Sequence, residues 1–248
     1  MDRPIDPDGY FDEPVAATYD QSTAAMSTPE AVAPVVAFLA DLAGSGRALE
    51  LGIGTGRIAI PLAQRGVPIH GIELSRAMAA RLRAKPGGDD IGVTIGDFAT
   101  TAVDGTFSLA YLVFNTIMNL TTQDAQVECF RNVSAHLEAG GSFIVEVAVP
   151  GLQRLAPGQR LQDFDVSERH WGLDEYDVAT QGLTSHFFRF EDGAVRHSSI
   201  PFRYVWPAEL DLMARLAGMR LRERWGGWQR EPFTSESRQH ISVWEKPR

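Results

Sequence analysis

Short apolar runs alternate along residues 28–149 with longer stretches in which apolar residues recur every three or four positions. The longer stretches predict helices, because that spacing places apolar side chains on one helical face. Five apolar runs predict β-strands, at 47–51, 67–73, 91–95, 107–114 and 142–149. Repeated strand–helix units of this kind form a mostly parallel, doubly wound sheet with helices on both faces.

The pattern changes after the fifth strand, because residues 150–205 show no helical periodicity. This region predicts three antiparallel strands, at 170–180, 183–191 and 194–205, with a hairpin turn at Asp192-Gly193. A helix near 206–217 and two closing strands near 219–225 and 240–246 follow. We therefore expect an antiparallel insertion within one α/β fold.

Composition and charge narrow the function classes. The 248 residues suit one α/β domain with an insertion, and the formal net charge of −9 lacks the basic run that favours nucleic-acid binding. The single cysteine, Cys129, excludes an internal disulfide and a cysteine metal cluster, and we expect no metal. With neither an 18-residue apolar run nor a signal-peptide pattern, the sequence predicts a cytoplasmic protein without membrane contact.

A glycine-rich turn follows the first predicted strand, with Glu50 before it and Gly52, Gly54 and Gly56 within it. Ligands of doubly wound sheets bind beyond the carboxyl ends of the strands, and glycine lets the backbone approach a ligand closely. Glu73 ends the second strand, about 20 residues further on, where an acid binds ribose hydroxyls. The sequence therefore predicts a nucleoside-containing cofactor.

Two cofactor classes fit this arrangement, a dinucleotide and S-adenosylmethionine. The dinucleotide fingerprint Gly-x-Gly-x-x-Gly requires glycine at the position that Arg57 occupies. The carboxylate of Glu50 would repel a pyrophosphate, whereas it suits the ammonium and sulfonium groups of S-adenosylmethionine. We therefore favour S-adenosylmethionine and keep an NAD-dependent oxidoreductase as the alternative.

Four motifs, in this order, resemble those of class I S-adenosylmethionine-dependent methyltransferases of the small-molecule type. They are Glu50-x-Gly52-x-Gly54-x-Gly56, Gly71-Ile72-Glu73-Leu74-Ser75 with Met78, Gly96-Asp97-Phe98, and Leu137-Glu138-Ala139-Gly140-Gly141, with Ala139 replacing the usual proline. The resemblance covers about residues 28–150 and the closing strands. It implies a Rossmann-like seven-stranded sheet whose last strand is antiparallel, a small β insertion after strand five, and S-adenosylmethionine as cofactor.

The same resemblance implies which residues hold the methionine and ribose portions of the cofactor. Glu50 and the backbone around Gly52 and Gly54 would contact the methionine portion, and Gly56 completes the cofactor-binding turn. Glu73 would bind the two ribose hydroxyls.

The remaining implied contacts concern the adenine and the reacting methyl group. Leu74 and Met78 would flank the adenine, Asp97 would accept a hydrogen bond from its amino group, and the backbone N–H of Phe98 would face the ring. Asn115, which follows the fourth strand, would lie near both the methionine end and the acceptor.

Similar small-molecule enzymes cover their active site with the N-terminal segment and the insertion. The resemblance divides the chain into a lid segment, a cofactor-binding core, an insertion roofing the active site and a closing unit, at 1–27, 28–149, 150–206 and 207–248. Tyr19 and Asn115 are predicted to line the reaction site. We expect methyl transfer to a nitrogen or oxygen of a small-molecule acceptor, by a monomer or homodimer.

Some alternatives stay open at this point. One of His170, His186, His197 and His240 could be a general base, since histidine titrates near neutral pH. A binding module that retains the cofactor pocket without turnover is a further hypothesis. The sequence does not identify the acceptor.

Overall fold

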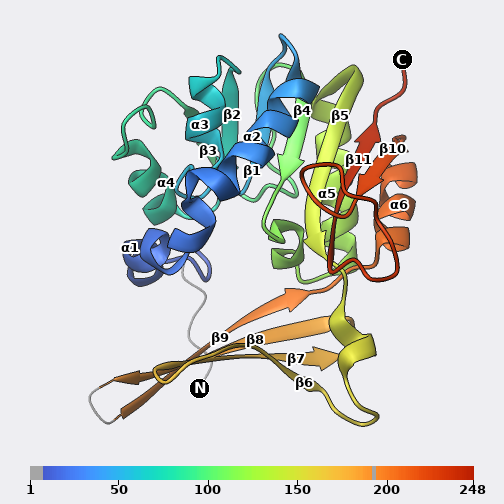
Figure 1. Ribbon diagram of the computed structural model, residues 1–248. Coiled ribbons are helices and arrows are strands. Elements are labelled where there is room, and N and C mark those ends of the chain that lie inside the picture. Colours follow the sequence, from blue (N-terminus) through green and yellow to red (C-terminus); the bar gives the residue numbers. More distant parts are fainter. Residues whose placement is uncertain (1–7, 192–193) are drawn as a thin grey trace.

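A seven-stranded sheet with the strand order β10-β11-β5-β4-β1-β2-β3 forms the centre of the molecule (Figure 1). The computed structural model describes residues 8–191 and 194–248, so the predicted turn at 192–193 and the first seven residues of the lid segment lie outside the described residues. The strands are β1 Ala48–Leu51, β2 Ile69–Glu73, β3 Gly92–Ile95, β4 Phe107–Leu112, β5 Leu137–Ala148, β10 Arg220–Trp225 and β11 Gln239–Glu245. β1 to β5 pair in parallel, whereas β11 is antiparallel to both of its neighbours. The predicted sheet, including its antiparallel last strand, is confirmed.

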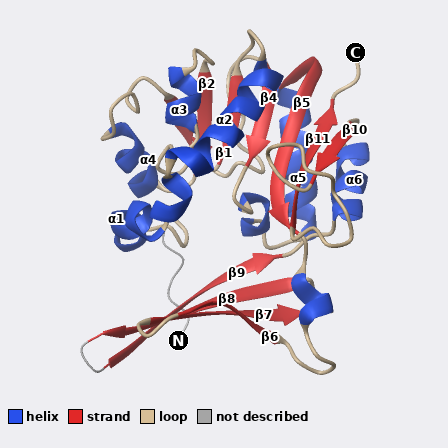
Figure 2. Ribbon diagram, in the orientation of Figure 1, coloured by secondary structure: helices blue, strands red, loops and turns tan. Residues whose placement is uncertain are grey.

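Helices cover both faces of this sheet (Figure 2). They are α1 Glu13–Ser22, α2 Pro29–Ala43, α3 Ala59–Gln64, α4 Arg76–Arg83, α5 Gln123–His136 and α6 Pro207–Leu216, with short 3-10 turns at η1 Ala24–Ser27, η2 Thr116–Asn119 and η3 Gly151–Arg154. In β4, Tyr111 belongs to the core cluster that includes Leu39 of α2, whereas Leu112 belongs to the one that includes Phe130 of α5. Because successive side chains point to opposite faces, β4 is mostly apolar and is buried on both sides.

The helix α3, after the glycine-rich turn, has only six residues. It begins at Ala59, so Pro61 lies in its first turn, where the missing backbone N–H costs no intrahelical hydrogen bond. Pro61 is therefore compatible with this short helix.

The insertion after β5 forms a separate antiparallel sheet with the strand order β6-β7-β8-β9. Its strands are β6 Leu161–Val166, β7 His170–Asp177, β8 Gly182–Glu191 and β9 Ala194–Arg203. In Figure 1 this sheet lies below the larger one, beyond the ends at which the β4 and β5 arrows point. The sequence predicted three of these strands and missed β6, whose side chains are nearly all exposed and show no apolar run.

A buried ion pair joins the two sheets through α5 and α6. Arg203, at the end of β9, donates hydrogen bonds to Glu209 of α6 at 2.7 Å, to Gln126 of α5 at 2.6 Å and to Gln181 at 3.0 Å. Gln126 in turn donates to the backbone oxygen of Arg203 at 3.2 Å. This network fixes the base of the smaller sheet against the helices of the α/β core.

Candidate active site

The carboxyl ends of β4, β1, β2 and β3 lie next to one another, because these strands are consecutive in the sheet. The turn after β1 is left-handed at Gly52, where φ is 68°, and at Gly54, where φ is 57°. A β-carbon on Gly52 would lie 2.7 Å from Cγ2 of Thr116, too close for any other residue without a shift. Glycine is therefore required where the chain after β1 passes the chain after β4.

Glu73, at the end of β2, connects that strand to the glycine-rich turn. Its Oε2 accepts a hydrogen bond from the backbone N–H of Gly54 at 2.7 Å, and its Oε1 accepts one from Ser75 at 2.9 Å. Burial raises the pKa of this carboxyl, while the two N–H donors oppose the shift. Each carboxylate oxygen retains a further lone pair, so the side chain has acceptor capacity for two hydroxyl groups.

Glu50, at the carboxyl end of β1, is fully enclosed. The hydroxyl of Tyr111 on β4 donates to its Oε2 at 2.8 Å. Burial is the main cause that raises the pKa of Glu50 to about 8. The sequence analysis did not assign a role to Tyr111, although it places a polar group in an otherwise nearly all-apolar strand, and that signal could have identified it.

The residues predicted to surround adenine lie at the ends of β2 and β3. Asp97 is exposed, and its Oδ1 accepts from the N–H of Ala99 at 2.8 Å. Phe98 is buried beside the turn, with a ring carbon 3.8 Å from where a β-carbon on Gly52 would be. Leu74 is 44% exposed, whereas Met78 is buried against α1. Asp97 and Leu74 are thus open to a ligand, and Met78 lies beneath the turn.

The N-terminal segment packs against the β2–α4 connection. α1 carries the buried Ala16 against α4, and the backbone oxygen of Phe11 accepts from Ser75 at 2.6 Å. Burial raises the pKa of the Tyr19 hydroxyl, which also lies within the electrostatic influence of Arg57 and Glu73. The fold thus brings Tyr19 toward the predicted cofactor residues.

Asn115 lies in a strained turn directly after β4. Phe114 and Asn115 both have a φ of 59°, a conformation that costs non-glycine residues free energy. The side-chain oxygen of Asn115 accepts from the N–H of Ala148 at 2.7 Å, and Glu146 accepts from the N–H of Phe114 at 2.9 Å. Trp228 donates to the same Glu146 at 3.0 Å, so residues missed by the sequence analysis hold this turn in place.

The four candidate base histidines do not gather at this site. His240 is buried in β11, and burial lowers its pKa to about 3, which keeps it neutral. His186 and His197 face each other with their ring nitrogens 3.1 Å apart, and His170 bonds to Asp165 at 2.8 Å. In the described part of the chain, no hydrogen bond joins any of them to the glycine-rich turn or to Glu73.

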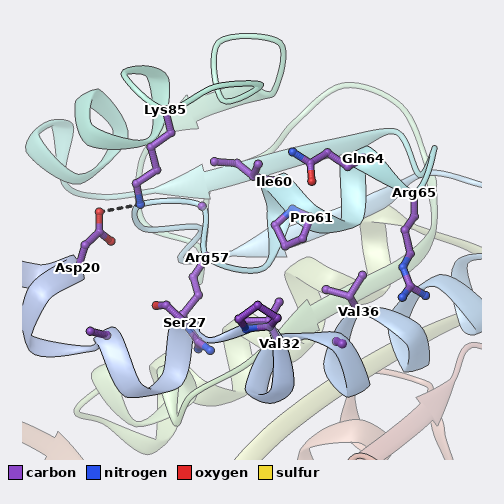
Figure 3. A pocket seen from close by; sticks show the side chains of 14 residues that line it. Asp20, Ser27, Val32, Val36, Arg57, Ile60, Pro61, Gln64, Arg65 and Lys85 are labelled. Carbon is purple, nitrogen blue, oxygen red and sulfur yellow. Dashed lines mark ion pairs between the residues drawn. The ribbon is translucent and has the colours of Figure 1, made fainter.

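A cavity of about 680 Å³ lies on the outer side of the turn, between α2 and α3 (Figure 3). Arg57, Arg65 and Lys85 line it, and Lys85 forms an ion pair with Asp20 at 2.7 Å. Of the predicted cofactor residues, only Gly56 contributes to its wall. This cavity is therefore separate from the cluster at the carboxyl ends of the strands.

Within residues 8–191 and 194–248, no group of three or more His, Cys, Asp and Glu side chains is placed to hold a metal ion. No helix in these same ranges has the length and apolar character needed to cross a bilayer.

Comparison with known proteins places this geometry in a family. Residues 48–141 match the family model described as a methyltransferase domain. The structure of the CcbJ methyltransferase from Streptomyces caelestis is 36% identical, with a TM-score of 0.84 over 94% of this chain and 96% of that one. The cypemycin N-terminal methyltransferase from Streptomyces sp is 27% identical over 241 residues, covering 95% of this chain and 97% of the relative.

A more distant structure shares the fold. The S-adenosylmethionine-bound CalS10 from Micromonospora echinaspora, an amino pentose methyltransferase, is 20% identical, with a TM-score of 0.68 over 92% of this chain and 96% of that one. The glycine-rich turn, the acid at the end of β2 and the sheet order agree with these similarities, and the oxidoreductase alternative is not favoured. The chain belongs to the class I S-adenosylmethionine-dependent methyltransferases.

Proposed function

We propose that this methyltransferase acts on an amine nitrogen of a small-molecule acceptor. Two similar proteins support this choice, since one is named for methylating an N-terminus and another for an amino pentose. When bound, S-adenosylmethionine supplies a methyl group activated on a sulfonium. The protein's part is then to orient the acceptor nitrogen toward that methyl group and to exclude water.

The observation that carries the proposal is the hydrogen bond between Glu73 and Gly54 at 2.7 Å. It joins the acid proposed to bind ribose to the turn proposed to hold the methionine portion with Glu50 and Gly52. A carboxyl beside a cationic ligand gains a favourable charge interaction, and the pKa of Glu50, about 8 without such a ligand, would fall when an ammonium or sulfonium lies next to it.

The adenine end would use the groups that the structure leaves open. Asp97 has one oxygen bonded to Ala99, which leaves its second oxygen to accept from the adenine amino group. Leu74, with Phe98 nearby, would provide the apolar contacts to the ring, and Met78 would support the turn from below.

A nitrogen acceptor is favoured over a hydroxyl because the two require different help. A neutral amine attacks without further activation, whereas a hydroxyl usually needs a base. His240, with a pKa of about 3 and no exposed surface, is not suited to that task. Tyr19 and Asn115 remain the residues that we propose to line the reaction site, with residues 1–27 and 150–206 covering it.

A small molecule also suits the charge of the chain better than a nucleic acid does. A formal net charge of −9 gives no broad attraction to phosphates. The oligomeric state, monomer or homodimer, stays a prediction, as does the absence of a nucleic-acid partner.

The cofactor part is tested by calorimetric titration with S-adenosylmethionine, S-adenosylhomocysteine and NAD. We expect wild-type protein to bind the first two and not NAD. Glu73→Ala should weaken their binding about 10- to 100-fold, because a hydrogen bond to a charged group contributes about 1.5–3 kcal/mol. Glu138→Ala, which removes an exposed acid at the start of β5, should leave the affinity unchanged. NAD binding tighter than that of either adenosyl ligand would contradict the proposal.

The acceptor part is tested by mass spectrometry after incubation with S-adenosylmethionine and a panel of small amines, each beside its hydroxyl analogue. A gain of one methyl group on amines alone is the expected result. Methylation restricted to the hydroxyl compounds would overturn the choice of nitrogen and leave the cofactor assignment intact.

A further inference from the structure

One face of the four-stranded sheet is directed at the α/β core. Tyr176 on β7 and Leu183 on β8 are buried in the same core cluster as Ile117 of η2. Asp174 precedes Tyr176 by two positions and Ser185 follows Leu183 by two, so that they lie opposite each other across the β7–β8 pair. Because side chains two apart in a strand share a face, Asp174 and Ser185 point to the same side as Tyr176 and Leu183.

This face lies beyond the carboxyl ends of the large sheet. Figure 1 shows β7 and β8 below the ends at which the β4 and β5 arrows point. β9, the neighbour of β8, runs beside η2, and η2 directly follows Asn115. A molecule held between Asp174 and Asn115 would therefore lie between the insertion and the predicted cofactor residues.

Asp174 carries a carboxylate that is largely buried and has no cationic partner of its own. Ser185, itself only 7% exposed, donates a hydrogen bond to its Oδ1 at 2.6 Å. Among the described residues, no arginine or lysine forms an ion pair with it, and the side chain of His186 lies on the opposite face of the sheet. Burial raises the pKa of Asp174.

A second half-buried acid near the insertion has a different environment. Glu209 is paired with Arg203 at 2.7 Å and accepts from Gln181 at 2.9 Å, and its pKa is lowered. A desolvated carboxylate without such a partner destabilises the protein unless a ligand supplies the charge. Asp174 thus lacks the basic partner that Glu209 has in Arg203.

We infer that Asp174 binds the ammonium group of the acceptor, with Ser185 holding its carboxylate in position. The inference rests on the proposed function and deepens it, because it names the feature of the acceptor that the enzyme selects. An amine that is protonated in solution would gain an ion pair with this half-buried carboxylate. Transfer of one proton from the ammonium to the Asp174 carboxylate would then leave the neutral nitrogen, whose lone pair attacks the methyl group. A neutral acceptor of the same shape would leave the carboxylate unpaired. Asp174 is therefore a specificity residue for cationic amines.

The test uses full-length protein saturated with S-adenosylhomocysteine and titrated with matched pairs of probes. Each pair is an amine and its neutral counterpart: glucosamine and N-acetylglucosamine, a short alanyl peptide and its N-acetyl form, cyclohexylamine and cyclohexanol. In wild-type protein at least one amine should bind 10-fold or more tightly than its partner. Asp174→Asn should reduce that preference by about 10- to 100-fold, the range expected for a charged hydrogen bond.

Two variants keep the result interpretable. Asp163→Asn removes the same charge from an exposed position on β6, paired with Leu173 and so on the outer face, and should leave the preference unchanged. Ser185→Ala keeps the charge but not its positioning, so a smaller loss of about 3- to 10-fold is expected. Unchanged affinity for S-adenosylhomocysteine shows that each variant is folded.

The outcomes separate the two proposals. If S-adenosylhomocysteine binds but no amine is preferred over its neutral partner, or if Asp174→Asn keeps the preference, the role of Asp174 is overturned while the methyltransferase assignment stands. If S-adenosylhomocysteine itself does not bind, both the cofactor assignment and the proposed role of Asp174 are contradicted.

Discussion

The two sheets of this protein are stabilised in different ways. The central strands of the seven-stranded sheet are buried on both faces, and Phe143 and Trp244 within it have no exposed surface. The four-stranded sheet exposes large apolar side chains, among them Phe164, Val166 and Trp171. Its inner face also contains polar groups such as Asp174. The first sheet therefore supplies most of the buried apolar surface. The side chains of the second sheet can be substituted without disrupting the hydrophobic core.

The comparison extends to the chemistry of the site. The proposed cofactor contacts come from strand ends and turns of the first sheet, which the packed core holds rigidly. The proposed acceptor contact comes from the second sheet, which is joined to that core at its base by Arg203. This division is consistent with one cofactor and variable acceptors among similar proteins.

The largest effect is expected from breaking the joint between the sheets. Arg203→Ala removes a buried guanidinium with its hydrogen bonds to Glu209, Gln126 and Gln181, which should destabilise the protein by about 3–5 kcal/mol. Urea denaturation followed by circular dichroism measures this loss. Arg160→Ala, which removes an exposed pair with Glu175, should change stability by less than about 1 kcal/mol. Equal effects of the two substitutions would show that the joint is unimportant.

Ionisation of Glu50 is expected to have an effect of intermediate size on the free energy of unfolding, and this effect depends on pH. Its folded pKa is about 8, raised from an ordinary value of 4.5, so the folded protein holds a proton that the unfolded chain releases. The stability from this group is present below pH 4.5 and is lost as pH rises toward 8, on the order of a few kcal/mol. Urea midpoints of cofactor-free protein between pH 5 and pH 8 measure the slope. Glu50→Gln should flatten it, and an unchanged slope would contradict the assignment.

The smallest effect is expected on the outer face of the insertion. Trp171 is 46% exposed and contacts Phe190, with ring centroids 5.3 Å apart. Trp171→Ala should destabilise the protein by about 1 kcal/mol or less, whereas Phe143→Ala in the large sheet should cost about 3–5 kcal/mol. Thermal unfolding of the two variants provides the comparison. A loss from Trp171→Ala as large as that from Phe143→Ala would remove the distinction between the two sheets.

Sequence patterns were most informative where burial is complete. The strands near β1, β4 and β5 could be predicted because their runs are apolar, and β11 could be predicted for the same reason. β10 has only Leu221 and Trp225 as apolar residues, and its side chains are exposed or half-buried. β6 was missed because its side chains are exposed, and α1 because only Ala16 is buried in it. A buried element has a recognisable pattern of apolar residues in the sequence, whereas an exposed element has little such pattern.

The site shows the same limit. Glu50, Glu73 and the glycines could be identified because they sit at fixed distances from predicted strands. The roles of Tyr111 and Asp174 depend on partners more than ten residues away, Glu50 and Ser185, and on which face of a strand is covered. Neither the identity of these partners nor the covered face of a strand can be predicted from one sequence unless the strand pairing is known.

The strained turn at Phe114 and Asn115 has a consequence for the energetics of binding. Its left-handed backbone is held by hydrogen bonds to Glu146 and Ala148, which both belong to β5. The free energy needed to reach this conformation is therefore supplied once, during folding, and not at each encounter with a ligand. Ligands then meet a surface with little reorganisation energy left, so their residence times should depend on the contacts they make and not on the refolding of this turn.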